Sequence, residues 1–245
     1  MRKRIAILTL MACMASSASF AQWKIMSYNI RGGRGMDGVC SYQRIADAIL
    51  RELPDVVAVQ EIDSVTGRSN GKYVLGEVAT LTGMHDTFAP AINFDGGKYG
   101  IGILSREKPR KATAHPLPGS EEARVILVAE FKKYVLCCTH LSLTEADRKA
   151  SLSLIKELAK GTRKPFFLAG DFNDEPASPF IQTLQQDFVI LSDLNAPTFP
   201  ASDPENTIDY ITAYKKTARK LKVTSQRVAN EPVASDHRPI VVELR

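Results

Sequence analysis

The fold is decided by Pro165-Phe166-Phe167-Leu168-Ala169-Gly170-Asp171-Phe172-Asn173, an apolar run that ends in a glycine and two polar side chains. A short apolar run bounded by turn residues predicts a buried strand, here over 165–169. In α/β proteins, ligand-binding side chains gather where such strands end. The stretch therefore predicts a buried strand that carries Asp171 and Asn173 to a functional site.

The same arrangement recurs at other strand ends along the chain. The polar residues concerned are Asn29 after 25–28, Glu61 after 56–60, His140 at the end of 134–140, Asp209 at the start of 209–213, and Asp236 with His237 just before 240–244. Any one of them could simply cap a turn. Their recurrence favours a shared site instead. The donors are mostly oxygens, which suit a hard ion such as Mg²⁺, Mn²⁺ or Ca²⁺ better than structural zinc.

Hydrophobic periodicity predicts alternating strands and helices without a low-complexity linker. Strands are expected at 24–30, 56–60, 100–104, 124–131, 134–140, 165–169, 209–213, 221–228 and 240–244, and helices at 42–53, 72–82, 145–160 and 179–186. The early strand–helix order indicates parallel pairing, whereas the strands at 124–131 and 134–140 are separated only by Lys132 and Lys133 and predict an antiparallel hairpin. The sequence thus predicts an α/β sandwich with mixed sheets, formed as a single domain by residues 22–245.

The N-terminus reads as a targeting segment. Arg2, Lys3 and Arg4 precede an apolar run, and small residues end the segment at Ala21. This pattern is typical of a secretory signal peptide over 1–21, so we expect export to the periplasm or the extracellular space. A lipoprotein anchored through Cys13 is the alternative. No run of 18 apolar residues follows, so no transmembrane segment is expected.

Net charge and cysteine usage limit the classes of function. The chain has 245 residues, 32 basic and 27 acidic; residues 1–21 hold three of the basic and none of the acidic ones, which leaves 29 against 27. Such a balance gives little general attraction to nucleic acid. Cys40, Cys137 and Cys138 make no disulfide framework. Cys137 and Cys138 are expected to be buried small hydrophobes, the alternative being a cysteine nucleophile beside His140.

Taken in order, the motifs resemble those of the endonuclease/exonuclease/phosphatase superfamily. They are Met26-Ser27-Tyr28-Asn29-Ile30, Val59-Gln60-Glu61, Tyr99-Gly100-Ile101-Gly102-Ile103-Leu104-Ser105, Thr139-His140-Leu141, Gly170-Asp171-Phe172-Asn173, Ile208-Asp209-Tyr210 and Ser235-Asp236-His237. The resemblance runs from about Lys24 to the C-terminus and implies the deoxyribonuclease I-like fold, a four-layer α/β sandwich of two packed mixed sheets flanked by helices. The loop 29–38 and the helix after it resemble the branch of secreted bacterial metal-dependent hydrolases, whose relatives include sphingomyelinase-like phosphodiesterases and exonucleases.

The resemblance also implies a role for each site residue. Glu61 would be the principal metal ligand, and Asn29 and Asp236 would be further ligands, Asp236 either directly or through water. His237, oriented by Asp209, would take a proton from the attacking water or stabilise the phosphoryl oxygens. Asp171 and Asn173 would position the nucleophile and a phosphate oxygen. His140 would donate hydrogen bonds to the phosphate. Arg124 would organise the phosphate, the alternative being a solvated charge at the end of a strand.

Two further arginines, Arg31 and Arg34, lie in the glycine-rich loop after Asn29. They could bind substrate phosphate, although a flexible surface loop is the simpler interpretation. Tyr99 departs from the family pattern because its register is uncertain by one residue. A role for Tyr99 as a phosphate contact is therefore not assigned.

The functional prediction is an exported Mg²⁺- or Mn²⁺-dependent hydrolase of phosphate esters, with Ca²⁺ as an alternative ion and a phosphodiesterase as the favoured type. Its substrate could be a lipid head group, a nucleic acid or a small phosphate ester, because this fold handles all of them. We expect a monomer without a protein partner. The alternative is a non-catalytic module that binds a phosphate ligand or a phosphoinositide. A serine hydrolase is disfavoured because the chain has no Gly-x-Ser-x-Gly motif.

Overall fold

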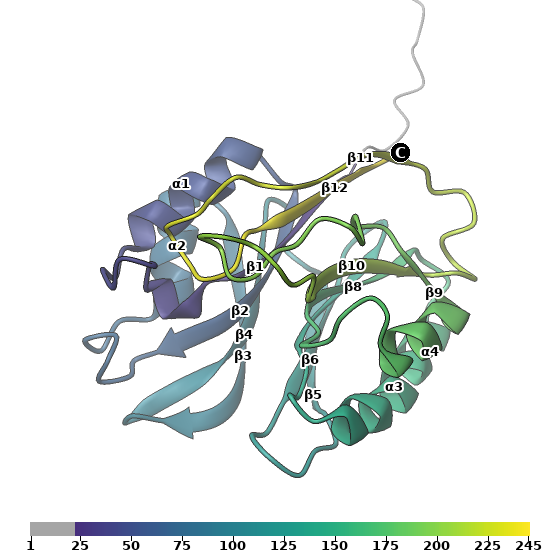
Figure 1. The fold of residues 1–245 in the computed structure, drawn as a ribbon, viewed down its shortest axis with the longest axis horizontal. Coiled ribbons are helices and arrows are strands. Elements are labelled where there is room, and N and C mark those ends of the chain that lie inside the picture. Colours follow the sequence, from purple (N-terminus) through teal and green to yellow (C-terminus); the bar gives the residue numbers. More distant parts are fainter. Residues whose placement is uncertain (1–22) are drawn as a thin grey trace, which may run out of the picture.

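Two six-stranded sheets packed face to face form the centre of the molecule (Figure 1). A computed structural model describes residues 23–245, so the predicted signal peptide and Cys13 lie outside the described residues. The first sheet has the order β11-β12-β1-β2-β4-β3 and the second β5-β6-β7-β8-β10-β9. The strands are β1 (Trp23–Asn29), β2 (Val56–Ser64), β3 (His85–Phe94), β4 (Gly97–Ser105), β5 (Lys111–Pro116), β6 (Val125–Glu130), β7 (Val135–His140), β8 (Phe166–Asp171), β9 (Phe188–Ile190), β10 (Asp209–Tyr214), β11 (Val223–Val228) and β12 (Ile240–Leu244).

Each sheet mixes parallel and antiparallel pairs. β1 and β2 run parallel, as do β7 and β8, while the other pairs are antiparallel. The hairpin of β6 and β7 is confirmed by the antiparallel register of Ile126 with Thr139. In each sheet one parallel pair therefore brings two strand ends to the same edge, where polar residues can meet.

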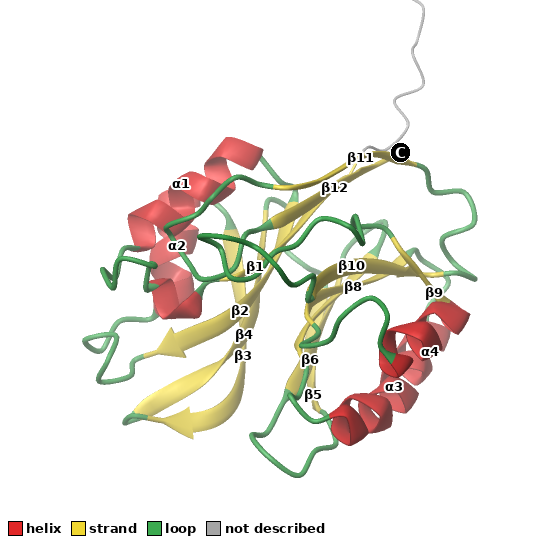
Figure 2. Ribbon diagram, viewed as in Figure 1, coloured by secondary structure: helices red, strands yellow, loops and turns green. Residues whose placement is uncertain are grey.

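Helices cover the outer face of each sheet (Figure 2). α1 (Tyr42–Glu52) and α2 (Val74–Thr82) pack on the first sheet, and α3 (Glu145–Lys160) and α4 (Pro179–Asp187) on the second. Ser41 and Ser178 cap α1 and α4 with their hydroxyl oxygens, as their sequence positions favour. The layer order helix–sheet–sheet–helix confirms the predicted four-layer sandwich.

The apolar space between the sheets is filled from both sides. Ile25, Val56 and Ile103 of the first sheet pack against Leu136 and Phe167 of the second, and all five are buried. Complete burial on both faces explains why β2, β7 and β8 read as continuous apolar runs rather than as alternating ones. This rigid core fixes the relative positions of the strand ends that carry the site.

The sequence missed three strands, β3, β5 and β9. β3 and β5 are the edges of their sheets, and many of their side chains are exposed, so neither shows an apolar run. β9 has three residues and follows α4 directly. β2 continues beyond 60 to Ser64 through a bulge, and the helix expected at 72–82 begins at Val74. Among residues 23–245, no helix is long and apolar enough to cross a membrane.

Candidate active site

Strand register brings the polar residues of the second sheet together. Asp171 at the end of β8 is the register partner of His140 on β7 and of Asp209 on β10. All three side chains are buried. Three neighbouring strands therefore place a histidine and two carboxylates in one row at the edge of this sheet.

Asn29 links this row to the first sheet. Its amide nitrogen donates to Glu61 Oε1 at 2.9 Å and to Asp171 Oδ2 at 3.1 Å. Its amide oxygen accepts from the backbone N–H of Arg31 at 3.1 Å. Asn29 is fully buried, so these contacts replace the water that its amide would otherwise bind. The two sheets thus contribute adjacent halves of a single site, and in this arrangement Asn29 holds Glu61 and Asp171 together through its nitrogen. Its predicted role as a metal ligand stays a prediction.

Glu61 occupies a special backbone position. The pairing of β2 with β4 is interrupted by a bulge between Val59 and Ile62, and Glu61 has a φ of 58°. A bulge of this kind turns one side chain away from the regular alternation of the strand, at a cost in backbone strain. Burial raises the pKa of Glu61 despite the hydrogen bond from Asn29, and the charge of Asp236 raises it further. An uncompensated carboxylate held in this way favours a cation.

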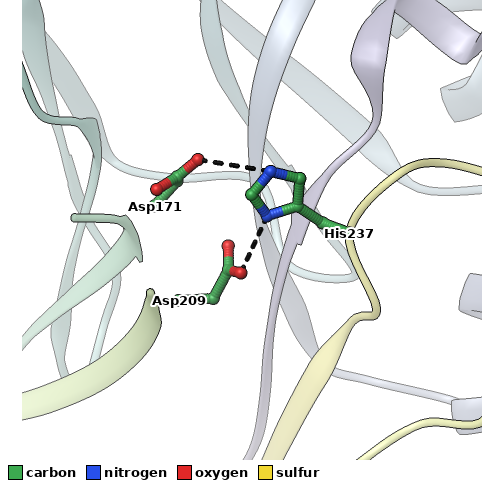
Figure 3. Close-up of side chains that lie close together, drawn as sticks. All are labelled: Asp171, Asp209 and His237. Atoms are coloured by element: carbon green, nitrogen blue, oxygen red, sulfur yellow. Dashed lines mark hydrogen bonds and ion pairs between the residues drawn. The ribbon is translucent and has the colours of Figure 1, made fainter. Parts of the chain in front are cut away.

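His237 lies between two carboxylates (Figure 3). Its Nδ1 is 2.9 Å from Asp209 Oδ2, and its Nε2 is 3.7 Å from Asp171 Oδ2. Burial lowers the pKa of His237, but the charges of Asp209, Asp171 and Asp236 outweigh that effect and raise the pKa to about 10. The imidazole is therefore protonated at neutral pH, with Nδ1 donating a hydrogen bond to Asp209 and Nε2 at ion-pair distance from Asp171.

Thr198 completes the support of His237 and was not identified from the sequence. Its hydroxyl donates to Asp209 Oδ2 at 2.6 Å, the same oxygen that accepts from His237. The Phe199 ring lies against the imidazole with 4.9 Å between ring centroids. Both residues belong to the loop before β10, whose sequence offers no strand pattern from which their position could be read.

His140 has the opposite electrostatic setting. Its Nε2 is 3.5 Å from Asp171 Oδ2, and its side chain is 9% exposed. Burial lowers the pKa of His140 to about 4; the charge of Asp171 opposes this shift, while Arg124 and His237 add to it. Asp171 therefore faces a neutral imidazole on one side and a cationic imidazole on the other, which is the arrangement that separates acid, base and hydrogen-bonding roles in active sites.

Asn173 lies beside Asp171 in a tight turn. Its φ is 51°, and its backbone N–H donates to Asp171 Oδ1 at 2.9 Å. Its side-chain nitrogen donates to the carbonyl of Leu141 at 2.9 Å. These bonds fix the orientation of Asp171 and tie the ends of β7 and β8 together. The amide oxygen of Asn173 carries no hydrogen bond among the described residues.

Asp236 and Arg124 lie on opposite flanks of the site. Asp236 Oδ2 pairs with Arg31 Nε at 3.2 Å, so the arginine of the glycine-rich loop reaches the acidic cluster. Arg124 Nη1 pairs with Glu122 at 3.0 Å, and Arg124 Nε is buried without a hydrogen-bond partner in residues 23–245. Arg124 also acts on the pKa values of His140 and Tyr99. It is therefore a half-buried cation facing the site rather than a fully solvated strand end.

The residue types around Glu61 fit a divalent cation. Asp171, Asp209 and His237 offer ligand atoms within 4.8 Å of one another, all buried. Both His237 nitrogens, however, are already directed at carboxylates, Nδ1 at Asp209 and Nε2 at Asp171. Glu61 with Asp236 supplies carboxylate oxygens of the kind that Mg²⁺ and Mn²⁺ prefer. The oxygen-rich side of the site is the better candidate for the metal.

Cys137 and Cys138 are excluded as nucleophiles. Both are completely buried in β7, and burial raises the pKa of both thiols, that of Cys138 to about 12. A thiolate is the reactive form, and it is not populated in such surroundings at neutral pH. Their interpretation as buried small hydrophobes agrees with the structure.

Comparison with known proteins identifies the family. A sequence model described as the endonuclease/exonuclease/phosphatase family matches residues 26–237, which is most of the chain. The chain belongs to this family. Its members are in general hydrolases of phosphate esters, nucleases and phosphatases among them. The matched region includes all of the residues assigned to the site.

The individual relatives that match this chain have low sequence identity to it. The uncharacterized protein YbhP of Escherichia coli K12 is 31% identical over 130 residues, 49% of this chain and 50% of YbhP. The chain thus aligns with about half the length of this curated relative. An endonuclease/exonuclease/phosphatase from Bacteroides vulgatus has a TM-score of 0.76 at 19% identity, covering 92% of this chain and 99% of that one. A mannosyl-6-phosphatase from Bacteroides thetaiotaomicron has a TM-score of 0.71 at 20% identity, covering 91% and 99%. These structural likenesses show the shared fold.

Proposed function

We propose that the protein is an exported hydrolase of phosphate esters that depends on a divalent metal, with a phosphodiesterase as the favoured type. The observation that carries the proposal is Asp171, a buried carboxylate between a neutral His140 and a cationic His237, next to the oxygen-rich cluster around Glu61. A site for phosphoryl transfer needs hydrogen-bond donors for the phosphoryl oxygens, a group that orients water, and a cation.

Glu61 and Asp236, with Asn29 beside them, would hold Mg²⁺ or Mn²⁺, and Ca²⁺ is the alternative. When bound, the ion would neutralise charge on a phosphoryl oxygen. The support is chemical: these side chains present hard oxygen donors, and the pKa of Glu61 is raised by burial and by nearby acids that a cation would balance.

In the proposed reaction, Asp171 orients the attacking water and accepts its proton. The water oxygen forms a bond to phosphorus, the bond from phosphorus to the leaving oxygen breaks, and the leaving oxygen takes up a proton from solvent while Asp171 later returns its proton to solvent. His237 is protonated at neutral pH and held by Asp209, so it suits donation to a phosphoryl oxygen better than proton abstraction.

Hydrogen bonding of the substrate falls to the second sheet. His140 is neutral and would donate one hydrogen bond to a phosphoryl oxygen without adding charge. Asn173, fixed by its bonds to Asp171 and to the carbonyl of Leu141, would steady the nucleophile and a phosphate oxygen. Arg124, whose buried Nε has no hydrogen-bond partner among residues 23–245, would supply a cationic contact to the phosphate.

A direct test uses purified protein with bis-(4-nitrophenyl) phosphate as the diester and 4-nitrophenyl phosphate as the monoester. We expect Mg²⁺-dependent release of nitrophenol that EDTA abolishes. Glu61→Gln and Asp171→Asn should each lower kcat/KM by about 10²–10⁴, since each removes an interaction of the charged transition state. Exposed Glu107→Gln is the matched control. Full activity in both site variants would refute the assignment.

The same experiment separates catalysis from simple binding. Binding of phosphate esters without metal-dependent turnover of any ester would support the non-catalytic module instead. A higher kcat/KM on the monoester than on the diester would replace the phosphodiesterase with a phosphatase and leave the metal site and the acid–base assignment standing.

We also propose that residues 1–21 are removed during export. The sequence pattern that supports it is the basic start, apolar run and small residues ending at Ala21. Protein recovered from the periplasm or medium of a bacterial host should have Gln22 as its first residue by intact mass. A lipidated N-terminus at Cys13 would support the anchored alternative, and an intact N-terminus in the cytoplasm would refute export.

A further inference from the structure

A pocket of about 400 Å³ lies directly beside Glu61. It is bounded by the loop that follows β1 and by the segment that follows β2, and three arginines line it, Arg31, Arg34 and Arg68. Glu61 and Asp63 form its floor on β2. Three guanidinium groups therefore lie next to the proposed metal ligand Glu61, in a pocket that His140, Asp171, Asp209 and His237 do not line.

Arg68 is held ready for a ligand. Its Nε donates to Asp63 Oδ2 at 2.8 Å. Its guanidinium carbon lies 4.4 Å from the centroid of the Phe94 ring and 5.5 Å from that of Tyr99. Its side chain is nonetheless 48% exposed, and its two terminal nitrogens make no hydrogen bond within residues 23–245. A guanidinium fixed on one edge and free on the other is preorganised to bind an anion in a bidentate way.

The loop that carries Arg31 and Arg34 is also fixed. Gly32 has a φ of 61°, and a Cβ there would lie 2.7 Å from Asp63 Oδ2, so only glycine lets the loop approach β2 this closely. The backbone N–H of Arg34 donates to the carbonyl of Arg31 at 3.0 Å, and Arg34 forms a β-bridge with Cys40. The loop therefore forms a fixed wall of the pocket and is not a flexible surface loop.

The charges of the pocket favour a negative group. Arg31 pairs with Asp236 and Arg68 with Asp63, whereas Arg34 has no acidic partner in the part of the chain that the structure describes. If a cation balanced the charges of Glu61 and Asp236, the three arginines would carry more positive charge than Asp63 could neutralise.

We propose that this pocket binds a second anionic group of the same substrate, so that the preferred substrates are phosphate esters carrying a further carboxylate or phosphate. The proposal rests on the proposed function for the phosphate that reacts. It extends that function by assigning Arg31, Arg34 and Arg68 to substrate selection.

Matched substrate pairs test the proposal. In the first pair, the 4-nitrophenyl phosphodiesters of glycerol 3-phosphate and of 3-phosphoglycerate, a carboxylate replaces a hydroxymethyl group. In the second pair, thymidine 5′-(4-nitrophenyl phosphate) with and without a 3′-phosphate, the members differ by a phosphate. We expect kcat/KM to be about tenfold or more higher for the member with the second anion, the effect of one charge-assisted contact. The first pair reports on carboxylates and the second on phosphates. Equal kcat/KM within both pairs would overturn the proposal.

Variants tie any preference to the pocket. Arg34→Gln and Arg68→Gln should each bring the ratio of kcat/KM within a pair towards one, and most of the change should lie in KM. The exposed Arg219→Gln is the matched control for loss of one charge and should keep the wild-type ratio. An unchanged ratio in both pocket variants, with urea midpoints that show them folded, would refute the assignment.

Cys40 gives a readout that needs no turnover. It is exposed and lines the pocket, whereas Cys137 and Cys138 are buried. In the Asp171→Asn variant with Mg²⁺, 3-phosphoglycerate should slow alkylation of Cys40 by iodoacetamide severalfold, followed on its tryptic peptide by mass spectrometry, and glycerol 3-phosphate should not. Protection without turnover of any ester would refute the hydrolase and keep the anion pocket. Metal-dependent turnover with no preference within the substrate pairs and no protection of Cys40 would refute the anion pocket and keep the hydrolase.

Discussion

The lowered pKa of His140 makes a prediction about stability in acid. The folded protein keeps this imidazole neutral down to about pH 4, because burial disfavours its charged form, whereas in the unfolded chain it takes up a proton near the ordinary value of 6.5. As pH falls through this window the unfolded state binds more protons than the folded state. Stability is therefore present above pH 6.5 and is lost progressively towards pH 4.

The magnitude follows from the two pKa values. Between the two pKa values the unfolded state binds one proton more than the folded state, which lowers the free energy of unfolding by about 1.4 kcal/mol per pH unit. Moving from about pH 7 to about pH 4.5 therefore removes roughly 2.5 kcal/mol of the free energy of unfolding. In His140→Gln this contribution disappears. The variant is expected to start less stable at neutral pH, since it loses a packed buried side chain, but to lose about 2.5 kcal/mol less than the wild type on acidification.

The assay is urea unfolding followed by circular dichroism at both pH values, in EDTA so that no metal contributes. The difference between wild type and variant cancels the carboxylates that titrate in the same range. His85→Gln, a change at an exposed histidine, is the matched control and should follow the wild type. If wild type and His140→Gln lost the same free energy of unfolding on acidification, His140 would not be held neutral. The assignment of a neutral His140 and a cationic His237 to different roles would then be refuted.

Two further perturbations test the site's supports. Gly32→Ala adds a methyl group 2.7 Å from Asp63 Oδ2 at a φ of 61°. It should lower the free energy of unfolding by about 1–3 kcal/mol in urea titrations. Gly38→Ala is the control, because Gly38 has a φ of 77° but open space around it, so this variant has the backbone strain without the clash and should lower the free energy of unfolding less. Thr198→Val removes the hydroxyl that donates to Asp209, and kcat should fall about tenfold at nearly constant KM. A wild-type kcat would show that Asp209 needs no such support.

Much of the fold was predictable because its central strands are buried on both faces. β2, β7 and β8 read as apolar runs for that reason, and polar residues at their ends stood out. β3 and β5 could not be found in the same way. As edge strands they expose many side chains to water, and their sequences therefore carry no apolar run.

The sequence predicted which residues the structure brings together in the candidate site, but not their electrostatics. Sequence order placed Asp171 and His140 at strand ends, but only the parallel register of β7 with β8 shows that they face each other. The opposite pKa shifts of His140 and His237 depend on burial and on charges distant in the chain. Arg68 and Thr198 were missed because each lies in a loop and takes its role from a contact with Asp63 or Asp209.

The sandwich itself explains why the site lies where it does. The second sheet supplies Asp171, His140 and Asp209, and the first supplies Asn29 and Glu61 through β1 and β2. Asn29 donates to carboxylates from both sheets, so a sliding of one sheet over the other would break a buried hydrogen bond to a charged group. The interdigitated core around Phe167 resists such sliding. Close packing between the sheets thereby keeps Glu61 on the first sheet and Asp171 on the second in register within the candidate site.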